Sequence, residues 1–470
     1  MNILEAKNEI KNTVRIYLDK SEDESYVIPR ERQRPVLLIG APGIGKTAIM
    51  SAVAAELGIG FLGYTITHHT RQSAVGLPFI SEREFGGKKY SVTEYTMSEI
   101  VAEVYDAIEK QGKKEGILFI DEINCVSETL APAMLELLQH KKFGTHLIPE
   151  GWILTAAGNP EEYNKSVNEL DMVTLDRVKR IDVEPDYEAF KIYARERGLH
   201  ESVTCFLSLY NQYLFRAERT ADGFAFVTPR GWEDLSEAIS EYEKFSIPVT
   251  LPFISQYVQS PPIANEFFGF YKAFEKFGVA LVGDGAENGE TESIDLSSAK
   301  FEERFTVAEL IRSKAAKNAE KAMAKIRAAE YMEDAFKKQA TEGDGALSAA
   351  TEKLASDVAS GKLGRFEKAA YRRVADIIYS ADRAAAAAFK EESEEYGKKC
   401  AARIENLLKF GERSLGKNQE FVSAVTGMLE SENFVALITR FDCPEFYRIN
   451  SELLVGESDK IRELARKATK

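Results

Sequence analysis

The chain has 470 residues, of which 44% are hydrophobic and 29% charged, a composition typical of a globular protein with a buried core. This length favours two or three domains. The sequence contains no run of about 18 apolar residues, and charges are mixed into its first residues, so we expect neither a membrane span nor a secretory signal. We therefore expect a cytoplasmic protein with no membrane partner.

The formal net charge of -14 is unevenly distributed. Residues 301–470 carry 30 Lys and Arg against 29 Asp and Glu, whereas residues 1–300 carry 31 against 46. Because nonspecific nucleic-acid binding depends on neutralising phosphates, the acidic first part makes nucleic acid an unlikely partner and favours a protein.

The cysteines and histidines give no sign of a zinc site. The four cysteines lie far apart and form no Cys-x-x-Cys pair, which favours free thiols over a zinc site or a disulfide framework. His68 and His69 are adjacent, and neighbouring residues of a strand point to opposite faces, which disfavours a shared metal.

Five short apolar runs between residues 35 and 185 alternate with longer helix-like stretches. Runs of this kind predict the strands of a parallel sheet covered by helices on both faces. The expected strands are residues 35–39, 61–66, 117–120, 152–156 and 178–183. The sequence therefore predicts an α/β fold.

A glycine-rich loop comes directly after the first of these strands and predicts binding of a nucleoside triphosphate. Its glycines let backbone N–H groups turn toward phosphates, Lys46 reaches the outer phosphates, and the hydroxyl of Thr47 coordinates Mg²⁺. A helix expected to begin near Lys46 adds its positive end. The expected binding residues are Gly40, Pro42, Gly43, Ile44, Gly45, Lys46, Thr47 and Ala48. The fold is thus a P-loop NTPase core, with ATP and Mg²⁺ as the expected cofactors.

Polar residues end three later strands, at the sheet edge where open parallel sheets bind ligands. After residues 117–120, Asp121 is placed to hold Mg²⁺, and Glu122 to act as the base that orients water on the γ-phosphate. Asn159 follows the next strand, and its amide can fix the attacking water. Arg177 precedes the last expected strand and Arg180 lies near its beginning. Either arginine could stabilise charge in the transition state.

Outside this core the sequence predicts a hairpin and further helical domains. Gly86-Gly87 is the expected turn of a hairpin between residues 78–80 and 89–92, which could equally be a surface feature without function. Helices are expected at 187–197, 202–215 and 231–245. We expect four parts: an α/β domain at 1–184, a helical lid and extension at 185–280, a linker at 281–300, and a helical domain of unknown role at 301–470.

Five motifs follow one another in the order seen in AAA+ ATPases. They are the loop of residues 40–47, Asp121-Glu122, Gly158-Asn159-Pro160, Asp176-Arg177 and the run from Thr228 to Trp232. Over residues 30–275 the sequence most resembles the MoxR and dynein-related (AAA_5) branch of that family.

The resemblance implies a role for each matched residue. Lys46 and Thr47 would belong to Walker A, Asp121 and Glu122 to Walker B, Asn159 would be sensor 1 and Arg230 sensor 2. Arg177 would be the arginine finger that acts on a neighbouring subunit's nucleotide. MoxR-like chains commonly have Asp-Arg-Phe where this chain has Asp176-Arg177-Val178, so Arg180 remains the alternative.

The resemblance also implies partners. It implies a ring, with a homo-hexamer expected, a hairpin facing the central pore, and a client that could be a von Willebrand factor A domain protein. Our first hypothesis is an ATPase that couples hydrolysis to remodelling or maturation of a protein partner. The alternatives are an ATP-switched assembly scaffold with slow turnover and a DNA-directed motor.

Overall fold

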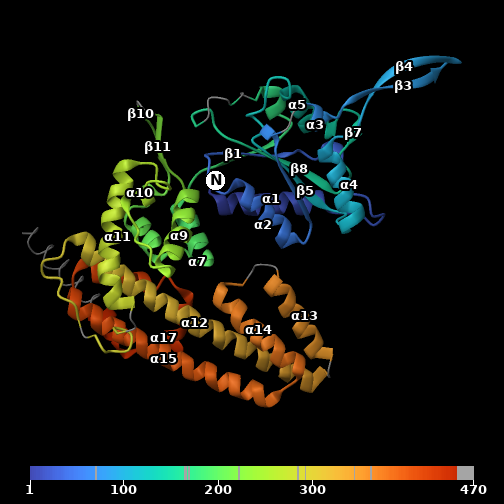
Figure 1. The fold of residues 1–470 in the computed structure, drawn as a ribbon. Helices are drawn as coiled ribbons and strands as arrows, with labels where there is room; N and C mark the ends of the chain where they lie inside the picture. Colours follow the sequence, from blue (N-terminus) through green and yellow to red (C-terminus); the bar gives the residue numbers. More distant parts are fainter. Residues whose placement is uncertain are drawn as a thin grey trace, which may run out of the picture. The chain divides into compact units, whose positions relative to one another are not determined.

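The computed structural model describes residues 1–68, 71–163, 167, 170–220, 223–282, 285–291, 293–342, 345–359 and 363–452. The chain divides into two compact units. Unit 1 comprises Met1–Ile192 and Gln212–Asp234, and unit 2 comprises Tyr193–Asn211 and Leu235–Lys470 (Figure 1). The sequence-based boundaries at residues 184, 280 and 300 stay a prediction.

Unit 1 is built on a five-stranded parallel sheet with the strand order β2-β5-β8-β1-β9. The strands are β1 Val36–Gly40, β2 Gly60–Thr65, β5 Gly116–Asp121, β8 Trp152–Gly158 and β9 Lys179–Val183. All five strands predicted from the apolar runs are present, and the predicted α/β fold with a parallel sheet is confirmed. The first strand, which carries the glycine-rich loop, lies between β8 and β9.

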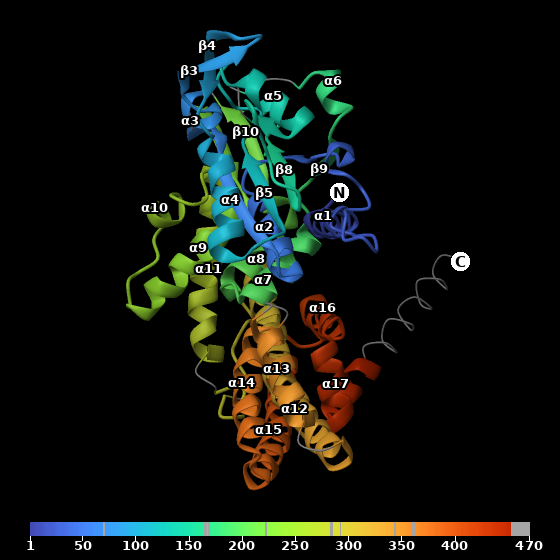
Figure 2. The ribbon, with the colours of Figure 1, turned by 90° about the vertical axis from the view of Figure 1, so that its right-hand side faces the viewer.

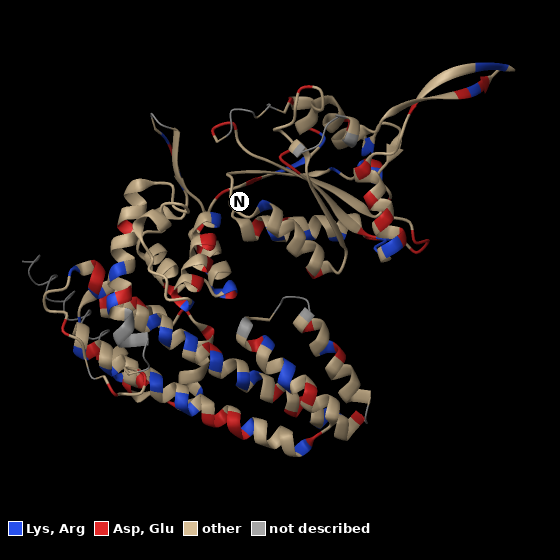
Figure 3. Ribbon diagram, in the orientation of Figure 1, with Lys and Arg blue, Asp and Glu red and all other residues tan. Residues whose placement is uncertain are grey.

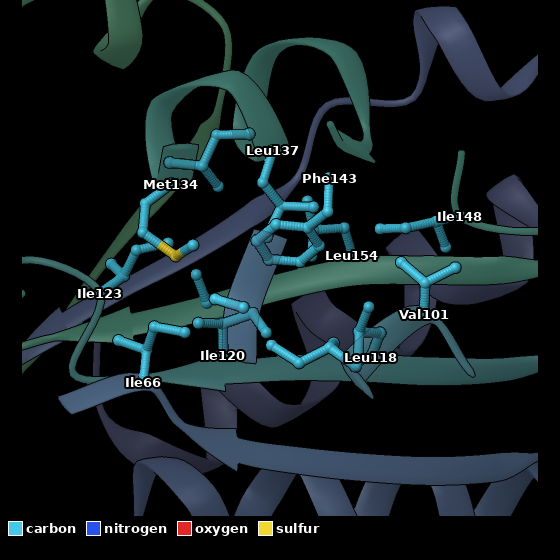
Figure 4. Close-up of a cluster of buried hydrophobic side chains, with 14 of the residues drawn as sticks. Ile66, Val101, Leu118, Ile120, Ile123, Met134, Leu137, Phe143, Ile148 and Leu154 are labelled. Carbon is cyan, nitrogen blue, oxygen red and sulfur yellow. The ribbon is translucent and has the colours of Figure 1, made fainter. Parts of the chain in front are cut away.

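Helices cover both faces of this sheet, so nearly every residue of its central strands is buried. Along β5, Leu118 and Ile120 join the core on one face, and Ile117 and Phe119 join the core on the other. The first core packs against α4 Glu99–Gln111 and α5 Ala131–His140 and is drawn in Figure 4. The second packs against α1 Ile3–Tyr17 and α2 Lys46–Leu57. This continuous burial explains why the strands read as unbroken apolar runs.

Two antiparallel hairpins accompany the sheet of unit 1. The first, β3 Pro78–Phe85 and β4 Lys88–Tyr95, confirms the predicted hairpin and is longer than expected. Gly86 and Gly87 form its turn with φ of 59° and 76°, values that glycine adopts without strain. The second, β10 Arg216–Thr220 and β11 Gly223–Val227, was not predicted.

The remaining elements of unit 1 are short connections around the sheet. They are η1 Arg30–Arg32, η2 Ile66–His68, α3 Arg71–Val75, β6 Lys142–Phe143, β7 His146–Leu147, α6 Met172–Leu175 and η3 Asn211–Tyr213. Helices α7 Tyr187–Arg197 and α9 Pro229–Lys244 each run from unit 1 into unit 2. Both helices were predicted to within two residues at each end.

Unit 2 is helical in its described part, as the sequence predicts for this region. Its helices are α8 Glu201–Leu209, α10 Leu251–Ile254, α11 Pro261–Val282, α12 Phe301–Glu342, α13 Gly345–Ala359, α14 Arg365–Ser380, α15 Arg383–Leu415, α16 Gln419–Met428 and α17 Glu432–Phe441. Helices α12 and α15 run side by side as the long elements of this unit (Figure 2). Gly397 and Gly411 on α15 allow close packing, since a Cβ at either would lie 2.4–2.5 Å from an atom of Phe441 or Phe421.

A short acidic segment at residues 285–291 is anchored to the long helices of unit 2. Glu287 is 6% exposed, and its carboxylate accepts hydrogen bonds from Lys314 and Asn318, both at 3.2 Å. Asn406 donates to the Glu287 carbonyl at 2.9 Å. This part of the predicted linker is therefore packed against α12 and α15.

In the described part of the chain, no single helix has both the length and the apolar character needed to cross a membrane. The pair α16 and α17 passes that test only when taken together, and it is bent by 84°.

Candidate nucleotide-binding site

The predicted phosphate loop connects β1 to α2 at the carboxyl edge of the sheet. Gly43 and Gly45 have φ of 75° and 95°, so both occupy the left-handed region that suits glycine, and Gly45 is the residue before the first turn of α2. A Cβ at Gly43 would lie 2.8 Å from the Thr228 hydroxyl oxygen. The loop therefore needs glycine both for its turn and for its close contact with the segment that begins α9.

Lys46 points its ammonium group into this loop, and the residue is only 8% exposed. Its Nζ donates to the carbonyl oxygens of Gly40 at 2.8 Å and Ala41 at 2.9 Å, and to Oδ1 of Asn159 at 2.9 Å. Burial lowers the pKa of Lys46 to about 8; Asp121 opposes this effect and Arg230 adds to it. The loop thus holds a partly desolvated cation where the sequence places the phosphates.

Thr47 and Asp121 meet beside this lysine. Thr47 Oγ1 donates to Asp121 Oδ2 at 2.6 Å, and Asp121 Oδ1 accepts from the Glu122 backbone N–H at 2.9 Å. A hydroxyl and a carboxylate in contact are hard oxygen donors of the kind Mg²⁺ prefers, with phosphate and water completing its shell. These two residues therefore fit the predicted magnesium site. The described residues contain no group of three or more His, Cys, Asp or Glu side chains that could hold a metal ion.

Glu122 directly follows β5 and has an unusual backbone conformation. Its φ of 57° lies in the left-handed region, which is uncommon for a residue with a long side chain. Its Oε2 accepts a hydrogen bond from Thr67 Oγ1 at 2.8 Å. Thr67 follows β2, the neighbour of β5, so the end of one strand orients the carboxylate of the next.

Asn124 was missed by the sequence prediction, although it connects two of the predicted motifs. It is 6% exposed, its Nδ2 donates to the Asn159 carbonyl at 2.8 Å, and its Oδ1 accepts from the Asn159 N–H at 3.2 Å. A Cβ at Gly158 would lie 2.5 Å from that same Oδ1. Asn124 therefore fixes the backbone of Asn159, whose side chain contacts Lys46.

The two candidate finger arginines differ in their surroundings. Arg180 on β9 forms an ion pair with Asp182 of the same strand at 2.8 Å. Arg177 is exposed, and its guanidinium makes neither a hydrogen bond nor an ion pair with any described residue. Hydrogen bonds from Thr174, and to a smaller extent the charge of Arg177, lower the pKa of Asp171.

Arg230 lies at the start of α9, beside the phosphate loop. Its backbone N–H donates to the Gly43 carbonyl at 3.1 Å, and its charge contributes to lowering the pKa of Lys46. The structure therefore brings Arg230 to the loop along with Asp121, Glu122 and Asn159. Among the described residues, neither Arg177 nor Arg180 forms a hydrogen bond or ion pair with this group.

A parallel sheet whose strands deliver a phosphate loop, two carboxylates and an asparagine at one edge defines the class of P-loop NTPases. Residues 36–168 match the family model AAA, the ATPase family associated with various cellular activities. The match covers β1 through the loop after β8 and supports an AAA-type, ATP-hydrolysing core. A search of the curated proteins gave no match.

Solved structures share limited likeness with this chain. A Cytophaga hutchinsonii protein assigned as an ATPase is 17% identical over 42% of this chain and 57% of its own, with a TM-score of 0.23. PCH-2 of C. elegans is 15% identical over 45% and 48%, with a TM-score of 0.26. NtrX of Brucella abortus, crystallised with ADP, is 14% identical over 43% and 44%, with a TM-score of 0.25. This chain thus spans about half the length of these proteins.

Proposed function

We propose that the chain is an ATP hydrolase of the AAA+ type, in the MoxR-like branch, that works as a homo-hexameric ring. In this proposal ATP hydrolysis drives the remodelling or maturation of a protein partner. The ends of β1, β5 and β8 bring binding, metal and water-positioning groups to one place, and this convergence carries the proposal.

The contacts of Lys46 are the observation with most weight. Its ammonium is held by two loop carbonyls and Asn159, at 2.8–2.9 Å, in a buried site. These contacts keep the cation pointed into the loop, where bound phosphate oxygens would become its partners. The first backbone N–H groups of α2 lie at the same place and add the positive end of the helix.

The remaining groups supply positioning and charge. Thr47 and Asp121 would hold Mg²⁺, which when bound neutralises charge on the phosphates. Glu122, oriented by Thr67, would orient the attacking water and accept its proton, and Asn159 would fix the same water. Arg230 would contact the phosphates of its own subunit from the start of α9.

The Arg177 guanidinium supports self-association. It is exposed and makes no contact with the nucleotide residues in the described part of its own chain, whereas an arginine near the γ-phosphate stabilises charge in the transition state. Two exposed apolar residues, Met172 at 85% and Val173 at 54%, lie just before it on α6. We propose that this surface meets the phosphate loop of a neighbouring copy.

We also propose that the client is a protein, with a von Willebrand factor A domain protein as the first one to test. The support for it is the family resemblance together with the acidic charge of residues 1–300, which disfavours nucleic acid.

The Glu122→Gln variant tests the proposed hydrolysis. It keeps the shape and hydrogen-bonding capacity of the side chain but removes the base, so we expect ATP binding to be retained and steady-state phosphate release to fall by about 100-fold or more. Glu150→Gln, in the turn before β8, is the matched control and should retain activity. Unchanged turnover in Glu122→Gln would overturn the assignment.

A further inference from the structure

The β3–β4 hairpin exposes both of its outer edges. Its strands of eight residues each extend for about 27 Å at 3.4 Å per residue, and neither pairs with another strand in the described part of the chain. The hairpin extends outward from unit 1 (Figure 1). Free edges of this length carry unpaired N–H and C=O groups that can pair with another strand.

Apolar side chains are exposed along the same hairpin. Ile80 is 77% exposed, Phe85 55%, Tyr90 50% and Phe79 44%. Isolated exposed apolar residues are ordinary on a protein surface, but here they share one two-stranded element that has no core beneath it. Burying them would stabilise the hairpin, which is otherwise a marginal structure in water.

The charges on the two strands are complementary. Arg83 and Glu94 form an ion pair at 2.6 Å across the hairpin. Lys89 and Glu82 form a second, longer ion pair at 3.6 Å, and both side chains stay largely exposed, at 75% and 69%. Counted by strand, β3 carries Glu82, Arg83 and Glu84, whereas β4 carries Lys88, Lys89 and Glu94 (Figure 3). One edge strand is therefore acidic and the other is basic.

The charges favour pairing of β3 in one copy with β4 in the next copy. Within the hairpin, Glu84 lies opposite Lys89 in an antiparallel register. When β3 of one copy lies beside β4 of the next in that same register, Glu84 meets the neighbour's Lys89 and Arg83 meets the neighbour's Tyr90. Opposite charges facing each other across strands are stabilising. Pairing β3 with a second β3 would offer Glu84 only Arg83, which already forms an ion pair with Glu94 of its own hairpin.

We propose that the β3–β4 hairpins of successive copies pair edge to edge, β3 to β4, and form a continuous antiparallel β-structure across the assembly. The contact is heterologous, because it joins different surfaces of the two copies, and can therefore extend around a closed ring. The inference rests on the self-association in the proposed function and adds a second contact, away from the nucleotide site.

Mixed cross-linking tests this pairing. Glu84→Cys and Lys89→Cys are prepared separately, one with a size tag, then mixed with ATP and oxidised. Because each variant adds a single thiol, a tagged and untagged dimer reports pairing between copies. We expect several-fold more of this dimer in the mixture than of dimers in either variant alone, and only background in the wild-type chain, whose native cysteines serve as the control.

The other outcomes separate this inference from the proposed function. Equal cross-linking by Glu84→Cys alone would mean β3-to-β3 pairing and would overturn the inference. Assembly and ATP hydrolysis without the mixed dimer would overturn it while leaving the proposed function intact. A chain that stays monomeric in sedimentation with every nucleotide would overturn both. Nucleotide binding by each variant shows that the core is folded.

Discussion

At the scale of single residues, Lys46 combines a buried charge with a functional position. A charge held at 8% exposure is costly unless a partner offsets it, and burial accordingly lowers the pKa of this lysine to about 8. Bound phosphates would offset the cost. Nucleotide binding should therefore be coupled to protonation of this one side chain.

This coupling predicts that nucleotide affinity depends on pH. Below pH 8 Lys46 is already protonated in the free protein and attracts phosphate; above pH 8 a proton must be taken up on binding. We expect the ADP dissociation constant to be flat from pH 7 to 8 and to rise by up to about tenfold per pH unit above 8. Calorimetric titration across this range measures it.

Lys141 provides the matched control for the pH experiment. Burial also lowers the pKa of Lys141 to about 8, and its ammonium bonds to the Arg30 carbonyl, away from the phosphate loop. Lys141→Arg should keep the pH dependence of the wild-type chain. A dissociation constant that stays flat up to pH 9.5 would contradict the role of Lys46.

Asn124 gives a second prediction at the residue scale. Asn124→Ala removes both side-chain bonds to the Asn159 backbone and leaves buried groups unpaired, so we expect about 1–3 kcal/mol less stability and slower ATP hydrolysis with nearly unchanged ADP affinity. Chemical denaturation and steady-state turnover measure these effects. Ser127→Ala, an exposed change in the same loop, should alter neither, and normal turnover in Asn124→Ala would refute the positioning role.

At the scale of elements, the start of α9 lies against the phosphate loop. Arg230 lowers the pKa of Lys46, so removing its charge should raise that pKa. We expect Arg230→Ala to weaken ADP binding by about tenfold at pH 7, since it removes one charge near the phosphates, and to move the onset of the pH dependence above 8. Arg219→Ala on β10 is the matched control and should change neither quantity. If the ADP dissociation constant of Arg230→Ala began to rise at the same pH as in the wild-type chain, Arg230 would have no electrostatic effect on Lys46.

The sequence allowed the strands and the loop of the core to be predicted, because they combine strong local signals. Apolar runs buried on both faces revealed the strands, and glycine spacing revealed the phosphate loop. The β10–β11 hairpin was missed because the charged run Arg216–Thr220 has no alternation of apolar residues. Asn124 was missed because its function depends on Asn159, which is 35 residues away and adjacent only in the folded sheet.

Arg177 and Arg180 show where sequence reasoning reaches its limit. Both are arginines near the start of the same strand, so residue type and spacing do not show which of them acts as the finger. Both are also exposed in the structure. The ion pair of Arg180 with Asp182 within β9 distinguishes them and favours Arg177 as the residue available to a neighbour. The sequence motif does not show that the side chain of Arg180 pairs with Asp182, two residues further along β9.

At the scale of the whole molecule, the proposed nucleotide residues all belong to unit 1, whereas the long helices belong to unit 2. In the proposed function, unit 1 of one copy supplies the phosphate loop, the magnesium residues and the water-positioning groups, and unit 1 of a neighbouring copy supplies Arg177. We therefore propose that a neighbouring copy completes each nucleotide site. Two variants that are each inactive for a different reason should therefore complement each other in a mixed assembly.

The most direct test mixes Arg177→Ala with Glu122→Gln and measures phosphate release. The Arg177→Ala copy keeps a complete Glu122, and the Glu122→Gln copy supplies Arg177, so a mixed assembly contains some complete sites. We predict that each variant alone is inactive, that the mixture recovers a substantial part of wild-type turnover, and that Arg180→Ala stays active. Full activity of Arg177→Ala alone, or no recovery in mixtures shown to co-assemble, would contradict it.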